Sequence, residues 1–457
     1  PYCAIRDHTE SNRTIRKEMT VMENILHLKA PGDWINDPNG FIYYKGKYHL
    51  FYQYFPCAPI WGTMHWGHAV SEDLIHWQHL GIALYPTKEY DRNGIFSGSA
   101  IEINGKMHLY YTAVRYIHED PDNIHGAIDG AIQSQAMICS EDGYTFDNRE
   151  GKRQIISAIE DVSIGDPYDC RDPKVWTEDG KYFMCLASTH QKQEGVLLLF
   201  TSSDGEHWSY LNRLQDKRLG YILECPDLFA VDGQHILMSS PMGIMKGTDY
   251  PENQATLQSV TFDTTTGGVK LSGTSKFLDY GMDLYAPQSN LDAEGRRTVI
   301  AWVRMPVPQK AEDNEAADGR PWNGMMALPR LVTIRDGQIC TPVHPAVRPY
   351  ISEGICSAYK DGNGGSSWTR DGRKCILISI TEGQTISVNG VKISLTDGCV
   401  CTDRSSCVPE NAVLHTHCKT PQVGTVCELE IYAERNLIEI FINDGQYVIS
   451  NVLYSQQ

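Results

Sequence analysis

The sequence predicts an all-β fold, a five-bladed β-propeller followed by a C-terminal β-sandwich. Almost no amphipathic helical pattern is present, and short apolar or aromatic runs are separated by Asp-Gly and Asn-Gly turns. A hairpin unit recurs five times, and a second turn unit keeps step with its first three copies. Near residue 340 the repeat gives way to alternating strands of another character. We therefore expect two domains, 1–340 and 341–457.

Length and charge limit the class of protein. With 457 residues, of which 41% are hydrophobic and 21% charged, the chain is long enough for two domains and a large core. A net charge of −17 argues against nucleic acid and anionic membranes as partners. No run approaches the roughly 20 apolar residues that span a bilayer. We expect a soluble protein with a small-molecule partner, and a homo-oligomer through the sandwich domain is a further option.

The cysteines and the first residues bear on location. Fourteen cysteines are too few for a disulfide scaffold, and several, such as Cys139 and Cys185, lie in apolar runs. The first residues lack the apolar core of a signal peptide. We expect a cytoplasmic protein. Secretion after removal of a leader is the alternative, since the chain begins at Pro1 without an initiator Met.

Eight cysteines follow residue 339, but their spacing lacks the paired ligands of a zinc site. Structural thiols or a local disulfide are expected there, and no metal. His65 and His68 do not favour a metal either, because residues three apart on a strand point to opposite faces.

Each predicted blade contains a hairpin with a glycine in its turn. A polar or basic residue and then an aromatic or aliphatic strand follow each of these glycines, which are Gly46, Gly105, Gly180, Gly233 and Gly295. The second unit reads Ser71 to Trp77, Ser140 to Phe146, and Ser203 to Trp208. Two interlocked repeats of this length predict four-stranded blades around one axis. Unrelated hairpins in a long β-protein are the alternative.

Three acids, Asp37, Asp172 and Glu224, lie eight or nine residues before the hairpin glycine of their blades. First strands line the channel of a propeller, so we expect the three carboxyl groups to meet in one axial pocket. The same place in the other blades holds Phe96 to Ser99 and Asp283 to Gln288. We interpret these two stretches as the aromatic and polar wall of a sugar pocket.

Some neighbouring residues fit two roles. Trp61 lies in a loop and is expected to stack on a sugar, whereas Trp66 and Trp77 are expected in the core. Cys225 has no histidine partner in its motif, so we expect it to pack beside Glu224 rather than act as a catalytic thiol.

The last third of the chain predicts a separate sheet structure. Pro342, Pro345 and Pro349 predict a linker, and residues 361–367 a flexible loop. Alternating runs between Lys374 and Ile449 then predict an antiparallel sandwich. It holds no comparable group of acids, so we assign it a structural role.

The ordered motifs of this chain resemble those of glycoside hydrolase family 32, the β-fructofuranosidases that include invertases, sucrose-6-phosphate hydrolases and fructan hydrolases. The matching blocks are Trp34 to Gly40, Arg171-Asp172-Pro173, Glu224 to Asp227, Gln53, Trp61 to His68, Phe96 to Ser99, Tyr285 to Gln288, Leu328-Pro329-Arg330 and Glu439 to Gly445.

This resemblance implies a retaining mechanism on a terminal fructofuranose of sucrose or a short fructo-oligosaccharide, with no cofactor or metal. It makes Asp37 the nucleophile, Glu224 the general acid and base, and Asp172 the stabiliser of the transition state. A retaining pair needs carboxyl groups about 5 Å apart, with the acid protonated when substrate arrives. The implied substrate-binding residues are Asn36, Gln53, Trp61, Phe96, Ser97, Arg171 and Tyr285.

The chain departs from the family pattern at two places that flank the pocket, and both bear on which leaving group is preferred. Asp169-Cys170 precede Arg171, and Phe55-Pro56 follow the aromatic strand. The segment Arg115 to Gly130 makes the second repeat the longest and is expected to form a loop over the pocket mouth. The alternatives are a sucrose-6-phosphate hydrolase, a fructosyltransferase and, more remotely, a non-catalytic sugar-binding propeller, which would be expected to lack one of the three acids.

Overall fold

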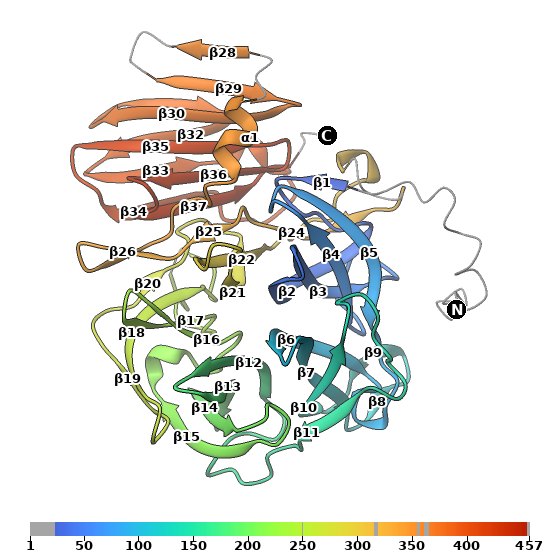
Figure 1. Ribbon diagram of the computed structural model, residues 1–457. Coiled ribbons are helices and arrows are strands. Elements are labelled where there is room, and N and C mark those ends of the chain that lie inside the picture. The colour runs from blue at the N-terminus through green and yellow to red at the C-terminus, as the bar shows by residue number, and fades with distance from the viewer. Residues whose placement is uncertain (1–22, 249, 315–318, 354–356, 361–364, 455–457) are drawn as a thin grey trace.

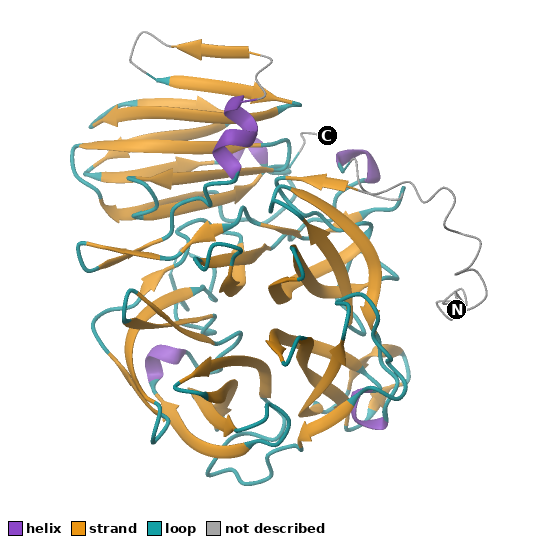
Figure 2. Ribbon diagram, in the orientation of Figure 1, coloured by secondary structure: helices purple, strands orange, loops and turns teal. Residues whose placement is uncertain are grey.

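The computed structural model describes residues 23–454 except 249, 315–318, 354–356 and 361–364. Figure 1 and Figure 2 show five sheets around one axis, with a two-sheet sandwich beside them. The predicted fold class is confirmed. No helix in this part of the chain is long and apolar enough to cross a membrane. The expectations about the first residues fall outside the described part.

The five sheets are the blades of the propeller, and neighbouring blades contact one another around the axis, mostly through their first strands. Blade one holds β1 (Glu23–Ile25), β2 (Asp33–Tyr44), β3 (Lys47–Phe55), β4 (His65–Ser71), β5 (His76–Leu84) and β23 (Trp322–Asn323). Blade two holds β6 (Gly94–Ile103), β7 (Lys106–Tyr116), β10 (Ala131–Ser140) and β11 (Arg153–Ile156), with the extra hairpin β8 (Glu119–Asp120) and β9 (Asn123–Ala127) between β7 and β10.

The remaining blades follow in chain order. Blade three holds β12 (Cys170–Glu178), β13 (Lys181–His190), β14 (Glu194–Ser202) and β15 (Ser209–Gln215). Blade four holds β16 (Asp227–Val231), β17 (Gln234–Ser239), β18 (Thr256–Asp263), β19 (Gly268–Leu271) and β20 (Lys276–Phe277). Blade five holds β21 (Leu284–Leu291), β22 (Arg297–Val303), β24 (Met325–Met326) and β25 (Arg330–Leu331).

Pairing between distant segments closes the ring. Strand β23 pairs in parallel with β2, with Asp33 opposite Trp322, so the end of the propeller sequence completes its first blade. Gly324 lies between β23 and β24 at φ 92°, where a Cβ atom would stand 2.0 Å from the Ile35 carbonyl oxygen. Only glycine fits this close approach.

Four of the five repeated hairpins share one turn geometry. Both central residues have positive φ in the turns Lys45-Gly46, Asn104-Gly105, Asp179-Gly180 and Asp232-Gly233. This is the type I′ geometry that matches the twist of antiparallel strands and favours Gly at the second position. The repeat detected in the sequence therefore reflects a physical requirement of the turn.

The second repeated unit is a turn stabilised by an aspartate. Asp73 Oδ1 accepts hydrogen bonds from the backbone N–H groups of Ile75 and His76, each at 2.9 Å. Equivalent bonds reach Asp142 and Asp204. The serine two residues before each aspartate completes the turn, and in the third copy this serine is Ser202. The predicted start at Ser203 was therefore one residue late.

The C-terminal sheets form the sandwich. One sheet holds β28 (Ser357–Lys360), β29 (Ser366–Arg370), β30 (Arg373–Thr381), β35 (Val426–Ala433), β36 (Leu437–Ile442) and β37 (Tyr447–Val452). The other holds β31 (Thr385–Val388), β32 (Val391–Thr396), β33 (Cys399–Asp403) and β34 (His417–Gln422).

The link to the sandwich differs from the prediction. The hairpin β26 (Thr333–Arg335) and β27 (Gln338–Cys340) ends at the predicted domain boundary, and α1 (Val347–Glu353) follows it. Pro349 lies in the first turn of α1, where a missing N–H group is tolerated, so the linker is partly helical. Ser366 begins β29, so the predicted loop extends too far, and residues 361–364 lie outside the described part.

Buried charges join the propeller to the sandwich. Arg330 of β25 donates to Asp279 at 2.8 Å and to Glu439 of β36 at 2.7 Å, and all three side chains are almost fully buried. His27 lies between Glu434 and Glu439 at 3.1 and 3.0 Å. Burial alone would lower the pKa of His27, but these two carboxylates outweigh it and raise the pKa to about 9.

Candidate active site

One cavity of about 470 Å³ opens on the propeller axis. Its wall includes the three acids and the seven substrate-binding residues that the family resemblance implies: Asn36, Asp37, Gln53, Trp61, Phe96, Ser97, Arg171, Asp172, Glu224 and Tyr285. Residues from all five blades therefore meet in one place, although they are up to 249 positions apart in the chain. Arg171 is the one Lys or Arg among the described residues of this wall.

Corresponding positions in or just before the first strands of the five blades form three sets, which we call the outer, middle and lower rings. The outer ring consists of Asn36, Phe96, Arg171, Glu224 and Tyr285. The next residue of each blade gives the middle ring, which consists of Asp37, Ser97, Asp172, Cys225 and Ala286. The lower ring lies two residues after the middle ring in each blade and consists of Asn39, Ser99, Lys174, Asp227 and Gln288.

A β-bulge aims the middle ring at the axis. The strand register shifts at this place in β2, β6, β12 and β21. In the last three blades the middle-ring residue has positive φ: 61° at Asp172, 46° at Cys225 and 48° at Ala286. A bulge bends the strand and turns a side chain out of the ladder, which is why bulges occur beside active sites.

Asp37 is surrounded by hydrogen-bond donors. Its Oδ2 accepts from the Ser97 hydroxyl at 2.6 Å and from the Cys225 thiol at 3.5 Å. Its Oδ1 accepts from the Asn36 amide at 3.0 Å, and the Trp34 indole N–H donates to Asn36 Oδ1 at 2.7 Å. Burial raises the pKa of Asp37, the Ser97 and Asn36 hydrogen bonds oppose this, and nearby Glu224 adds to it. The carboxylate is thus fixed in orientation.

Asp172 lines the same cavity. Its Oδ2 accepts from the backbone N–H of Cys225 at 2.8 Å. Burial raises the pKa of Asp172 to about 7, which Arg171 opposes and Asp37 reinforces. The raised pKa of Asp172 therefore reflects both its burial and the negative charge of neighbouring carboxyl groups.

Glu224 is held by two outer-ring neighbours. Arg171 Nη2 donates to Oε1 at 3.1 Å, and the Tyr285 hydroxyl donates to Oε2 at 2.8 Å. Glu224 does not occupy the same position in its blade as Asp37 does, although both precede their hairpin glycine by nine residues. Strand β2 has a second register shift, between Asn39 and Ile42, which adds one residue. Glu224 consequently lies one ring further out.

The lower ring closes the channel beneath the acids. Lys174 Nζ lies 3.0 Å from Asp227 Oδ2, and both side chains are almost fully buried. Asp227 also accepts from the backbone N–H of Ser289 at 2.7 Å. This ion pair joins β12, which carries Asp172, to β16, which follows Glu224. The floor of the site is therefore cross-linked.

Several wall residues were not predicted. These are Trp34, Tyr116, Gly126, Ala127, Gly130, Ala131 and Trp302. Four of them lie in or beside β9 and at the start of β10, so the long second repeat does reach the pocket mouth. Trp34 belongs to a recognised motif but has no reactive group, and Trp302 lies on the second strand of its blade. The sequence offered only the length of the second repeat as a signal.

Two side chains expected at the sugar pocket lie elsewhere. Asp283 forms a buried ion pair with Arg404 of the sandwich, because its side chain points to the domain interface. Gln288 belongs to the lower ring and donates to the Gly98 carbonyl oxygen.

The structure also places the neighbouring residues that fitted two roles. Cys225 is buried as expected, and its thiol donates to Asp37 Oδ2 at 3.5 Å. His68 lies 3.0 Å from His49, whereas His65 contacts the Thr63 carbonyl oxygen, so the two histidines have separate partners. Trp66 and Trp77 are core residues, as expected.

The described part of the chain bears on the predictions about metal ligands and cysteines. No group of three or more His, Cys, Asp or Glu side chains there could hold a metal ion. Cys57 is disulfide-bonded, and the eleven other described cysteines are free.

Comparisons with known proteins point to one family. The model of the glycosyl hydrolases family 32 N-terminal domain matches residues 27–342. A raffinose invertase of Escherichia coli is 38% identical over 69% of this chain and 63% of its own length. A sucrose-6-phosphate hydrolase of Escherichia coli is 33% identical over 94% of this chain and 89% of its own length.

Solved structures agree with this assignment. A Bombyx mori family 32 beta-fructofuranosidase superposes with a TM-score of 0.74 at 27% identity, covering 94% of this chain and 88% of that chain. A mutant of that enzyme in complex with sucrose gives a TM-score of 0.73 at 27% identity, covering 94% of this chain and 89% of that one.

Proposed function

The chain belongs to glycoside hydrolase family 32, and on that basis we propose that it is a retaining β-fructofuranosidase that releases terminal fructosyl units from sucrose or short fructo-oligosaccharides. The observation that carries this proposal is the meeting of Asp37, Asp172 and Glu224 in one cavity beside a single cation, Arg171. Two carboxyl groups with different surroundings are what a retaining glycosidase requires.

In the first step Asp37 attacks the anomeric C2 of the fructosyl unit. Glu224 gives its proton to the leaving glycosidic oxygen, so the bond from C2 to that oxygen breaks as the bond to Asp37 Oδ forms. The donors at Asp37 support this role, because the hydrogen bonds from Ser97 and Asn36 stabilise its ionised form and fix its orientation.

In the second step water replaces the enzyme at C2. Glu224, now ionised, takes a proton from this water, and the Asp37 carboxylate leaves. Arg171 and Tyr285 donate to Glu224 and support its ionised form between the two steps. We assign to Asp172 the stabilisation of the oxocarbenium-like transition state through hydrogen bonds to sugar hydroxyls.

Anomer-resolved NMR during sucrose hydrolysis tests the proposal. Double displacement releases β-fructofuranose first, which then equilibrates. Early release of the α-anomer would show a single inverting displacement and contradict the roles of Asp37 and Glu224. Product analysis at high sucrose separates hydrolysis from transfer, since accumulating kestoses would make the enzyme a fructosyltransferase.

The cellular location and the oligomeric state of the protein stay predictions. Free thiols fit the expected cytoplasmic location, whereas the Cys57 disulfide fits the secreted alternative. The homo-oligomer through the sandwich domain has no support beyond the sequence.

A further inference from the structure

Apart from the three acids and Arg171, the wall of the catalytic cavity is uncharged. Its aromatic side chains include Trp34, Trp61, Tyr116 and Trp302. Gly126, Ala127 and Ala131 of the β9 hairpin and the β10 start add small neutral groups. Trp61 is 45% exposed, so part of its surface is available to a ligand.

The cation of the cavity is already engaged. Arg171 Nη1 donates to Asp169 at 2.9 Å, while Nη2 donates to Glu224 at 3.1 Å. The wall therefore carries three acidic side chains and one guanidinium group whose partners are carboxylates. An anionic group on a bound sugar therefore has no cation available among the described residues of this wall.

Two other arginines, Arg304 and Arg320, are engaged too. Arg304 stacks on the Tyr285 ring at 4.8 Å and donates to the backbone carbonyl oxygens of Met282 and Asn253. Arg320 pairs with Asp33 and donates to the Pro56 carbonyl oxygen. Neither arginine is among the described residues that line the cavity.

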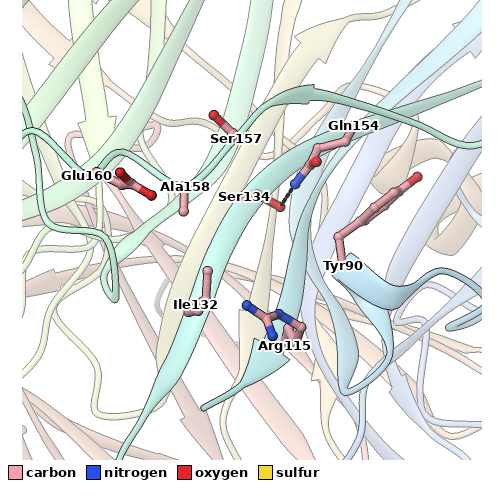
Figure 3. Close-up of a pocket in the computed structure, with 8 residues that line it drawn as sticks. All are labelled: Tyr90, Arg115, Ile132, Ser134, Gln154, Ser157, Ala158 and Glu160. Carbon is pink, nitrogen blue, oxygen red and sulfur yellow. Dashed lines mark hydrogen bonds between the residues drawn. The ribbon is translucent and has the colours of Figure 1, made fainter.

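Arg115 is close in the chain but faces a different cavity. In the ladder of β7 and β10, Tyr116 is opposite Ala131 and Arg115 is opposite Ile132. Because side chains alternate along a strand, the first pair lines the catalytic cavity and the second pair lines a cavity of about 570 Å³ on the other face. Figure 3 shows Arg115 and Ile132 at this second cavity with Ser134 and Gln154.

Two further basic side chains lie near the mouth. Lys192 pairs with Asp169 at 3.5 Å and is 64% exposed to solvent. His125 of β9 has its Nδ1 at 2.8 Å from the Thr63 hydroxyl, and burial lowers the pKa of His125, so it is neutral at pH 7. Neither supplies a free cation to the wall.

We propose that the leaving-group side of this cavity takes an unphosphorylated hexose, so that sucrose is hydrolysed in preference to sucrose 6-phosphate. This inference rests on the proposed β-fructofuranosidase activity and names its substrate class. A phosphate group carries about −1.5 to −2 charges at pH 7, and its desolvation is costly without cationic partners. Aromatic faces and small neutral groups suit the apolar faces of a neutral sugar.

The direct test compares kcat/KM of the wild-type protein on sucrose and on sucrose 6-phosphate. We expect kcat/KM for sucrose to be at least about tenfold higher. Tenfold is the loss expected when one charged group, here the phosphate, has no partner in the site. Equal values, or a preference for the phosphorylated sugar, would overturn the inference and leave the fructosidase proposal standing. Hydrolysis of neither sugar would reject the fructosidase proposal, and the inference with it.

A designed cation tests the cause of the preference. Ala127→Arg adds a guanidinium group to the wall, and Ala127→Gln is the matched control of similar reach without charge. We expect the ratio of kcat/KM for sucrose 6-phosphate to that for sucrose to rise about tenfold in Ala127→Arg only. An unchanged ratio, or an equal rise in the control, would show that the missing cation does not set the choice.

Discussion

At the residue scale, the chemistry depends on how differently the three acids are surrounded. Asp37 is bound by a hydroxyl, an amide and a thiol, while Glu224 is bound by a guanidinium and a phenol. Asp172 has a backbone N–H donor and its pKa is raised to about 7. These different surroundings are consistent with the three roles that we propose for the same functional group.

Replacing Asp37 removes the nucleophile without changing side-chain volume. We expect Asp37→Asn to lower kcat on sucrose by about 10⁴-fold or more, because the covalent step has no substitute. Asp179→Asn, in an exposed hairpin turn where Asn also tolerates positive φ, is the control and keeps the wild-type rate. Steady-state kinetics checks this, and a rate for Asp37→Asn within tenfold of wild type would contradict the assignment.

We expect replacement of Asp172 to abolish activity and to increase stability above pH 7. A carboxyl group whose folded pKa is about 7, above the ordinary 3.8, costs stability as pH rises from about 4 to 7. We expect Asp172→Asn to be inactive, equal to wild type in melting temperature near pH 4, and more stable above pH 7. Calorimetry across this range checks it. A constant difference between the two proteins at all pH values would show that Asp172 does not titrate in this range.

At the element scale, the bulges of the first strands determine what the sequence could reveal. The turn glycines and the ordered motifs were enough to predict the blades and ten of the seventeen wall residues. These sequence signals could not show that Glu224 lies one ring further out than Asp37, because this difference follows from the second register shift in β2. Nor could they place Asp283, since its partner Arg404 belongs to the other predicted domain.

The lower ring makes the floor of the site rigid. We expect Lys174→Met to reduce the free energy of unfolding by about 3–5 kcal/mol, because it leaves Asp227 buried without its cation. Adding Asp227→Asn should recover part of this loss. Urea unfolding of the single and double variants measures both effects, with Lys181→Met, an exposed change in the same blade, as the control. A Lys174→Met loss no larger than that of the control would refute the role of the pair.

At the scale of the whole molecule, the sandwich is held to the propeller by buried charges. His27, Arg330 and Asp279 of the propeller side meet Glu434 and Glu439 of the sandwich. Removing one member of such a network is costly, because it leaves a buried charge without a partner. The sandwich thereby stabilises the blades that carry the site, in agreement with a structural role.

The pH dependence of this interface follows from His27. Its folded pKa of about 9 exceeds the ordinary 6.5, so its contribution to stability is complete below pH 6.5 and is lost as pH rises through 9. We expect His27→Gln to be less stable than wild type by on the order of 3 kcal/mol at pH 6, with a much smaller difference above pH 9. Chemical unfolding at both pH values checks this. A difference that grows with pH would contradict the network.

The central claim is that Asp37 forms a covalent fructosyl intermediate which Glu224 helps to resolve. Mass spectrometry of the Glu224→Gln variant, quenched during reaction with a fructoside that carries a good leaving group, tests it most directly. The account predicts that the peptide containing Asp37 gains the mass of one fructosyl unit and that Asp37→Asn in the same background abolishes the label. A fructosyl unit on another residue, or turnover with no labelled peptide, would contradict it.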